Sequence, residues 1–230
     1  MARNIIECED GREHNNVLMV TENNNRKEID FYLTGEIKDI TDYIDLMREL
    51  ESCREGDMAT IHINCYGGYA DVALNLYDIL KSSDAEVVIS VEGACCSCAS
   101  MIMLGGDAWR ITPHSYVMIH SWSGGLFGKY HEMDACFEYS KKFVNSHFKE
   151  IYKNFLTEDE LEQCLGGKDF WFDSSETAKR INNYKKEDAE ISESIRKIAD
   201  KYSSMADKEI NEFLKNPVSS KGKKKGGKKQ

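Results

Sequence analysis

The chain has 230 residues, of which 41% are hydrophobic, and it carries a formal net charge of −10. This apolar content is enough for one sizeable core, with or without a helical appendage. No run of about 18 apolar residues occurs and residues 1–10 are polar, so neither a membrane span nor a secretory signal is expected. The acidic balance disfavours nucleic-acid binding as the main role, and we expect a cytoplasmic protein.

The C-terminal end differs from the rest in charge, because residues 216–230 contain six lysines and no acidic residue. We interpret this Lys-rich tail as a solvated, disordered segment, with contact to phosphate or to an acidic partner as the alternatives. Three of the eight cysteines, Cys95, Cys96 and Cys98, lie in one small-residue turn where mutual disulfides would be strained. We therefore expect reduced thiols.

The first half of the chain predicts alternating strands and helices. Residues 1–28 are polar and asparagine-rich, which favours a variable segment that is loose or hairpin-like. The expected elements that follow are a strand at 29–33, a helix capped by Thr41, a strand at 60–64, a turn at 67–68, a helix at 72–80, a strand at 86–91, a helix opened by Ser97 and a strand at 115–119. This alternation favours parallel α/β layers.

The second half predicts two long helices. The first, at about 132–155, follows a glycine-rich segment at 124–128, and its aromatic residues pack either within the chain or against another subunit. The second is a charged helix at 186–215 that Asn216-Pro217 ends. We thus divide the chain into a variable segment at 1–28, a catalytic-size domain at 29–183, a helical extension at 184–215 and the tail at 216–230.

Ser97 stands where a small-residue turn gives way to an apolar helix. A hydroxyl at such a helix start can face a cleft while free N–H groups favour a developing negative oxygen. A serine nucleophile also needs a base, an acid that orients the base, and oxyanion donors. His120 ends an apolar strand, where α/β folds place functional side chains, but this pattern alone leaves a catalytic and a structural role equally open. The other histidines read as surface or structural residues: His14, His62, His114, His131 and His147.

Two other classes of site lack the residues that they need. Cys95-x-x-Cys98 has no second cysteine pair or His-x-His to complete four zinc ligands. Gly67-Gly68 and Gly124-Gly125 lack the Gly-Lys-Ser/Thr of a phosphate-binding loop. We expect neither a metal nor another cofactor.

Several separated motifs resemble one known family. They are Ile-Asn-Cys-Tyr-Gly-Gly at 63–68, the serine block at 93–106, Tyr-Val-Met-Ile-His at 116–120, and the glycines of 124–128. In order and approximate spacing they resemble the proteolytic subunit of the Clp protease family over residues 29–180. That family has Asn-Ser-Pro-Gly-Gly, Gly-x-Ala-Ala-Ser-Met and Val-Met-Ile-His at these places. The resemblance implies an α/β fold of the ClpP and crotonase-like type, a spiral of β-β-α units with a projecting handle helix, and here an extra C-terminal helix.

The resemblance also implies roles for single residues. Ser97 matches the nucleophile and His120 the general base, and Asp169 matches the orienting acid, with Asp173 as a nearby alternative. The remaining matches are the backbone N–H groups of Gly68 and Cys98 for the oxyanion hole, and the substrate-pairing segment Gly124, Gly125 and Leu126.

The implied function is a serine endopeptidase that acts on polypeptides inside a homo-oligomeric ring, which we expect to be heptameric. Some features depart from the family: Tyr66 stands in place of proline, residues 180–183 replace a Gly-Leu-Ile/Val-Asp motif, and the N-terminus does not resemble the axial loop that meets an AAA+ ATPase. That possible partner is therefore in doubt. The alternatives are a noncatalytic ring subunit, an acyl-CoA enzyme of the same superfold, and a capsid-maturation type of processing protease without an ATPase.

Overall fold

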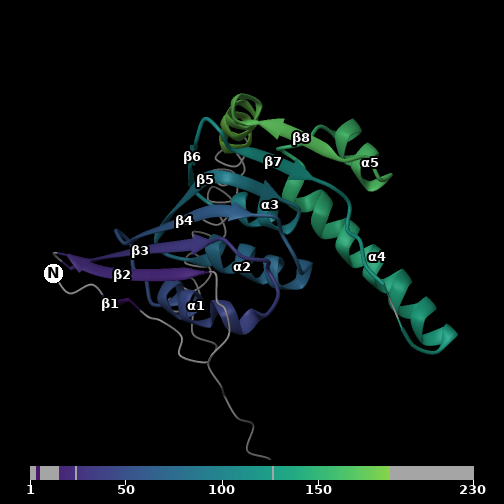
Figure 1. The fold of residues 1–230 in the computed structure, drawn as a ribbon, viewed down its shortest axis with the longest axis horizontal. Helices are drawn as coiled ribbons and strands as arrows, with labels where there is room; N and C mark the ends of the chain where they lie inside the picture. Colours follow the sequence, from purple (N-terminus) through teal and green to yellow (C-terminus); the bar gives the residue numbers. More distant parts are fainter. Residues whose placement is uncertain (1–3, 6–15, 24, 126, 187–230) are drawn as a thin grey trace, which may run out of the picture. The chain divides into compact units, whose positions relative to one another are not determined.

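A computed structural model describes residues 4–5, 16–23, 25–125 and 127–186 (Figure 1). Its centre is one eight-stranded sheet in the order β1-β2-β3-β4-β5-β7-β8, with β6 pairing beside β5. The strands are β1 (Asn4–Ile5), β2 (Val17–Asn23), β3 (Arg26–Leu33), β4 (Met58–Cys65), β5 (Glu86–Cys96), β6 (Ala108–Ile111), β7 (Tyr116–Ile119) and β8 (Phe170–Asp173).

The sheet is mixed. Strands β3, β4, β5, β6 and β7 pair in parallel, as the alternation of strands and helices predicts, whereas β2 and β8 pair antiparallel to β3 and β7. The hairpin of β2 and β3 matches the hairpin-like alternative for the N-terminal segment. The expected parallel layers are thus confirmed for the centre of the sheet, and the antiparallel edges come from segments outside that alternation.

Helices cover one face of this sheet in Figure 1, where α1, α2 and α3 lie together. The helical elements are η1 (Ile40–Tyr43), α1 (Ile44–Glu51), α2 (Ala70–Ser82), α3 (Cys98–Met103), α4 (Tyr130–Tyr152), α5 (Glu158–Leu165) and a helix at 174–186. The first of them is capped by Asp39, whose carboxylate accepts from the Thr41 N–H at 2.9 Å, so Thr41 is not the cap. The predicted helix at 186–215 and the Lys-rich tail lie outside the described residues, apart from Lys186.

The core lies between the helices and the sheet. Alternate residues of the parallel strands are buried, for example Ile61 and Ile63 of β4 and Val87 and Ile89 of β5. Burying one such side chain stabilises the fold by about 1.5–3 kcal/mol, so these strands fix the positions of the loops that follow them. No helix within the described ranges combines the length and the apolar content that a bilayer crossing requires.

The other face of the sheet is polar, and His62 belongs to it. The His62 ring stacks on Tyr32 with centroids 4.1 Å apart, and its Nδ1 lies 2.7 Å from a carboxylate oxygen of Glu92. Arg110 pairs with the same carboxylate. These contacts support the structural role expected for His62.

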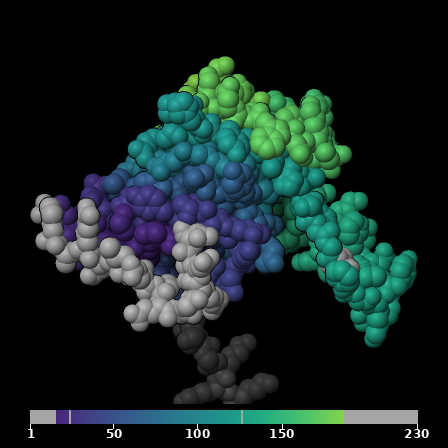
Figure 2. Space-filling model, viewed as in Figure 1, coloured from purple at the N-terminus to yellow at the C-terminus, as the bar shows by residue number. Residues whose placement is uncertain are grey.

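The long helix α4 has two different halves. Phe148, Ile151 and Tyr152 near its C-terminal end are buried, whereas Phe137 and Phe143 keep 45% and 40% of their surface exposed. The N-terminal half extends away from the sheet in Figure 1, and in Figure 2 it forms a projecting lobe together with the loop that precedes it. The sequence left the destination of these aromatic side chains open, and the single chain buries only those at the base of the helix.

Candidate active site

Ser97 joins β5 to α3 in an unusual backbone conformation. Its φ of 53° and ψ of −128° belong to a region that residues other than glycine rarely adopt. Two hydrogen bonds fix the turn: the Ser97 N–H donates to the Met118 carbonyl at 2.8 Å, and the Ser100 N–H donates to the Ser97 carbonyl at 2.9 Å. Strain of this kind costs about 1–3 kcal/mol and concentrates at functional sites. The sharp strand-to-helix turn presents the Ser97 hydroxyl at the edge of the sheet.

His120 directly follows β7, the strand beside β5. The two strands are parallel and pair Cys96 with Met118, so both end at the same edge. At that edge the Nε2 atom of His120 lies 2.8 Å from the Oγ atom of Ser97. This is the distance at which a histidine can accept a proton from serine.

Asp169 is adjacent to His120 in sheet register. The last pair of β7 and β8 joins Ile119 to Phe170, so one further step of this antiparallel register sets His120 opposite Asp169. Side chains directly opposite each other in an antiparallel pair lie on the same face. Asp169 is exposed, and no hydrogen bond joins it to His120 within the part of the chain that the structure describes.

Asp173, the alternative acid, lies at the other end of β8. It pairs with Tyr116, about 13 Å from His120 along the strand. Its carboxylate accepts a hydrogen bond from the Glu176 N–H at 2.8 Å and so caps the helix at 174–186. The register therefore favours Asp169 over Asp173 as a neighbour of His120.

The glycine turn after β4 packs directly against Ser97. A side chain at Gly67 would lie 2.7 Å from the Ser97 Cβ atom, and one at Gly68 would overlap the carbonyl oxygen of Ile37. Gly67 also has a φ of 101°, which an L-residue rarely adopts. Only glycine fits this turn beside the serine.

The backbone amides of Gly68 and Cys98 converge on one place. The Ile37 N–H donates to the Gly67 carbonyl at 2.9 Å, and the Tyr69 N–H donates to the Ile37 carbonyl at 2.7 Å. In this parallel pairing the N–H and the carbonyl of Gly68 itself point away from Ile37. The Gly68 carbonyl accepts from the Cys98 thiol at 3.1 Å, which sets this face toward α3. Burial raises the pKa of the Cys98 thiol, and hydrogen bonds from the backbone amides of Gly68 and Cys98 to its sulfur offset part of this rise. The glycine turn and the first residue of α3 thus lie beside Ser97, where the family resemblance expects the oxyanion donors.

Comparison with known proteins agrees with this geometry. The sequence model of the family described as Clp protease matches residues 13–181, which is more than half of the chain. The chain belongs to the Clp protease family.

Its curated relatives are distant. An ATP-dependent Clp protease proteolytic subunit of Bacteroides fragilis is 26% identical over 129 residues, which cover 55% of this chain and 62% of the relative. A protein of the same name from Chlorella vulgaris is 32% identical over 92 residues, or 39% of this chain and 46% of the relative. The matched region thus spans between about half and three fifths of these relatives' lengths.

The C-terminal end of α4 contacts the turn at residues 97–100, which we call the serine turn. The Ser100 hydroxyl donates to the Ser97 carbonyl at 2.6 Å and lies 2.6 Å from the hydroxyl of Tyr152. Burial raises the pKa of Tyr152 well above its usual value, so this phenol stays neutral. The sequence analysis missed Ser100 and Tyr152 as supports. The helical spacing of Phe148 and Tyr152 shows an apolar face, but it does not show which turn that face meets.

Free thiols surround the same turn. Cys65, Cys95, Cys96 and Cys98 are all buried and unpaired, as the expectation of reduced thiols requires. Burial raises the pKa of each, and that of Cys65 to about 11. Among the described residues no three His, Cys, Asp or Glu side chains are arranged to hold a metal ion. These cysteines therefore act as neutral, small side chains.

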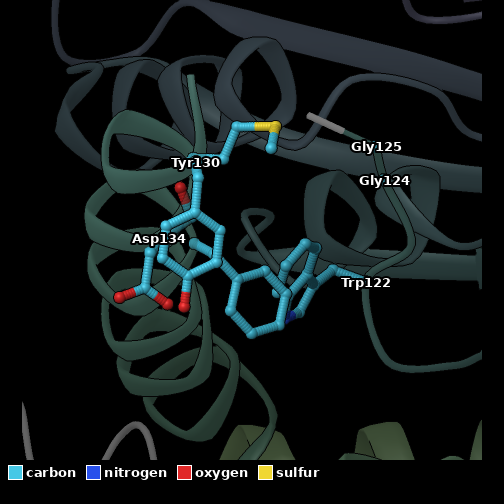
Figure 3. A pocket seen from close by; sticks show the side chains of 8 residues that line it. Trp122, Gly124, Gly125, Tyr130 and Asp134 are labelled. Carbon is cyan, nitrogen blue, oxygen red and sulfur yellow. The ribbon is translucent and has the colours of Figure 1, made fainter. Parts of the chain in front are cut away.

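A cavity of about 450 Å³ lies between the glycine-rich segment after His120 and the first turns of α4. Figure 3 shows the side chains that line it, with Trp122, Tyr130 and Asp134 labelled. Gly124 and Gly125 also line it and are exposed, as a segment that pairs with another chain would be. Leu126, the third residue expected there, lies outside the described residues. Tyr130, Met133 and Phe137 follow helical spacing, a signal that the sequence analysis did not use.

Proposed function

We propose that this chain is a serine endopeptidase of the Clp type that cleaves peptide bonds through an acyl-enzyme on Ser97. The observation that carries the proposal is the 2.8 Å contact between His120 Nε2 and Ser97 Oγ at a strained strand-to-helix turn. Serine is a weak nucleophile at neutral pH, and a histidine at this distance supplies the base that it needs.

In the first half-reaction the Ser97 oxygen attacks the carbonyl carbon of the scissile bond while its proton passes to His120 Nε2. The negative charge moves to the carbonyl oxygen, where the Gly68 and Cys98 amides donate to it. Collapse of the tetrahedral intermediate breaks the C–N bond, and the leaving amine takes the proton from His120. Water then repeats the sequence on the ester and releases Ser97.

Asp169 is the orienting acid of the proposal. For Nε2 to accept a proton, the other ring nitrogen of His120 must carry one, and a carboxylate opposite the ring favours that tautomer. The register of β7 and β8 supports this role, because it sets Asp169 opposite His120. A small shift of the exposed Asp169 side chain toward Nδ1 completes the triad in the working enzyme.

We further propose that an extended polypeptide pairs with the segment of Gly124, Gly125 and Leu126, and that copies of the chain form rings, with seven copies as the expected number. The exposed aromatic half of α4 supports contact with another copy. An AAA+ ATPase partner is supported only by the name of the relatives, which are called ATP-dependent. A processing protease that acts without an ATPase is the second form of this proposal.

The test is covalent labelling of size-fractionated protein with a fluorophosphonate, with the labelled residue mapped by mass spectrometry. We expect label on Ser97, none in Ser97→Ala, and at least about 100-fold slower labelling in His120→Ala. Ser82→Ala, at an exposed serine near the end of α2, is the matched control and should label like the parent chain.

Each other outcome points to a different conclusion. Absence of label on Ser97 in a correctly assembled ring would overturn the peptidase proposal and favour a noncatalytic subunit. Sedimentation of the labelled protein as a monomer at working concentration would overturn the ring and leave the chemistry standing. Labelling that survives in Asp169→Asn at the full rate would remove Asp169 from the mechanism.

A further inference from the structure

Two thiols contact the two glycines beside Ser97. The Gly67 N–H donates to the sulfur of Cys65 at 3.3 Å, and the Cys65 thiol in turn donates to the Gly35 carbonyl at 2.9 Å. Cys65 therefore links the first glycine of the turn to the loop that follows β3. Its exposed fraction is 0%, so water does not compete for these bonds.

The second thiol acts on the next peptide group. The Cys98 thiol donates to the Gly68 carbonyl at 3.1 Å, and its sulfur lies 4.0 Å from Ser97 Oγ. Ile37 forms hydrogen bonds to the Gly67 carbonyl and to the Tyr69 N–H, on either side of Gly68. The Cys65 and Cys98 thiols thus contact the peptide groups before and after the Gly67–Gly68 peptide group, which carries the Gly68 N–H and whose carbonyl accepts from the Ile37 N–H.

The two glycines make hydrogen bonds that restrain the turn necessary. Gly67 and Gly68 lack side chains that would restrict φ and ψ, so the turn can rotate its peptide groups more freely than other residues allow. Rotation of the Gly67–Gly68 peptide group would carry the Gly68 N–H away from the place where the proposed oxyanion forms, and holding the peptide groups on both sides of it restricts that rotation. A donor preorganised toward that oxygen contributes to rate, and one that must first reorient contributes less.

We propose that Cys65 and Cys98 are positioning residues, a thiol clamp that holds the Gly67-Gly68 turn so that the Gly68 amide points to the oxyanion on the Ser97 adduct. The proposal rests on the proposed function for its catalytic consequence. It adds a role for the Cys98 side chain, beyond that of its backbone amide. The family pattern has serine and methionine at the two positions, so the clamp is particular to this chain.

The experiment compares Cys98→Ala, which removes the donor, with Cys98→Ser, which keeps an O–H donor, and treats Cys65→Ala and Cys65→Ser in the same way. Cys136→Ala is the matched control, because Cys136 is an exposed cysteine on α4. Three quantities are measured: the labelling rate of Ser97 with a fluorophosphonate, the affinity for a peptide aldehyde that forms an oxyanion on Ser97, and deuterium exchange of the amides at 66–69.

We expect Cys98→Ala to slow labelling and to weaken aldehyde binding, each by about 10- to 100-fold, because one oxyanion donor is misdirected. Affinity for the corresponding peptide acid, which makes no oxyanion adduct, should change less than about 2-fold. Amide exchange at 66–69 should rise in the alanine variants. The serine variants should recover most of each quantity, and Cys136→Ala should change none.

The clamp is overturned if folded Cys98→Ala keeps the parent aldehyde affinity and amide exchange, or if Cys98→Ser folds and behaves like alanine. Equal losses of aldehyde and peptide-acid affinity would also overturn it, because a general packing defect affects both. Failure of the proposed function is separate: the parent chain would then not label at all. The exchange rates of the alanine and serine variants would still decide whether the thiols hold the turn.

Discussion

The serine turn and the N-terminal half of α4 differ in what surrounds them. Cys95 and Ala99 on either side of Ser97 are fully buried, whereas Tyr130 and Tyr139 on α4 keep 79% and 68% of their surface exposed. The turn is shaped by the chain's own core, and the contact between Ser97 and His120 forms within one copy. The exposed half of α4 has apolar surface that one copy does not cover, which is why we connect it with assembly.

The same helix joins the two regions, because Tyr152 at its base contacts Ser100 under the nucleophile. Substitutions at the turn should therefore change catalysis and stability together. Substitutions along the exposed half should change neither in a single copy. Three variants test this contrast, and a fourth, Arg180→Met, tests a contact outside both regions.

The largest effect is expected for Gly67→Ala. The new methyl group would lie 2.7 Å from the Ser97 Cβ atom, and the residue would have to adopt a φ of 101°. We expect labelling of Ser97 to fall by at least about 100-fold, because both the nucleophile and the oxyanion donors move. Gly56→Ala is the control: Gly56 has a φ of 97° but no atom within 4 Å of the added methyl group. It should lower the midpoint of urea unfolding and leave labelling unchanged.

Arg180→Met is expected to come next. Arg180 donates to both carboxylate oxygens of Glu160 at 2.8 Å and to the Phe155 carbonyl at 2.9 Å, and so ties α5 to the helix at 174–186. Loss of these partly buried bonds should cost about 1–3 kcal/mol of unfolding free energy in urea at pH 7. Lys179→Met, at an exposed ion pair, should cost less than about 0.5 kcal/mol. Equal losses of unfolding free energy in Arg180→Met and Lys179→Met would mean that the Arg180–Glu160 pair adds no more stability than an exposed ion pair.

The same pair makes a prediction about acid stability. The hydrogen bonds from Arg180 hold the pKa of Glu160 below its usual value. A carboxyl with a lowered folded pKa contributes stability that is present above its unfolded pKa and is lost as the pH falls through the folded value. Arg180→Met removes the part of that contribution that Arg180 supplies, so the difference in unfolding free energy between variant and parent should shrink below about pH 4, while the part due to the Phe155 carbonyl bond remains. A difference that stays constant down to pH 3 would contradict this assignment.

Tyr152→Phe removes one hydroxyl from beneath the serine turn. Ser100 keeps its bond to the Ser97 carbonyl, so we expect a loss of about 1 kcal/mol and a labelling rate reduced less than about 5-fold. Tyr139→Phe, on the exposed half of the same helix, should change both quantities by less than the error of measurement. A large effect at Tyr139 in a monomer would remove the contrast between the two regions.

Phe143→Ser is expected to have the smallest effect on a single copy. Phe143 is 40% exposed, so its loss should change the unfolding free energy by less than about 0.5 kcal/mol. In the proposed ring it should instead shift sedimentation toward smaller species. An unchanged oligomer would place the contact between copies elsewhere.

The centre of the fold could be predicted from sequence because its signals are strong. Apolar runs such as 86–91, punctuated by glycine turns, mark buried parallel strands. The end of β5 could not be found in this way, because residues 93–96 are small rather than apolar. The strands β6 and β8 are four residues each and too short to show a period.

Ser97 and His120 could be singled out because one begins an apolar helix and the other ends an apolar strand, but their roles rest on the resemblance to the family. The acid is harder, since its identity depends on how β8 pairs with β7, and a register shift of four residues would set Asp173 rather than Asp169 opposite His120. The contacts between Cys98 and Gly68, and between Ser100 and Tyr152, join segments 30 and 52 residues apart. No local pattern encodes such pairs, because they arise from the packing of elements that fold independently of them.

Strand β8 has a consequence for synthesis. It is antiparallel to β7, yet α4 and α5 separate the two strands in the chain. A ribosome adds about 5–20 residues per second, so the segment with Ser97 and His120 is made several seconds before Asp169. During that interval the nascent chain holds a serine and a histidine but no acid opposite them. The order of the elements thus delays the proposed triad until most of the residues matched by the family model have been made.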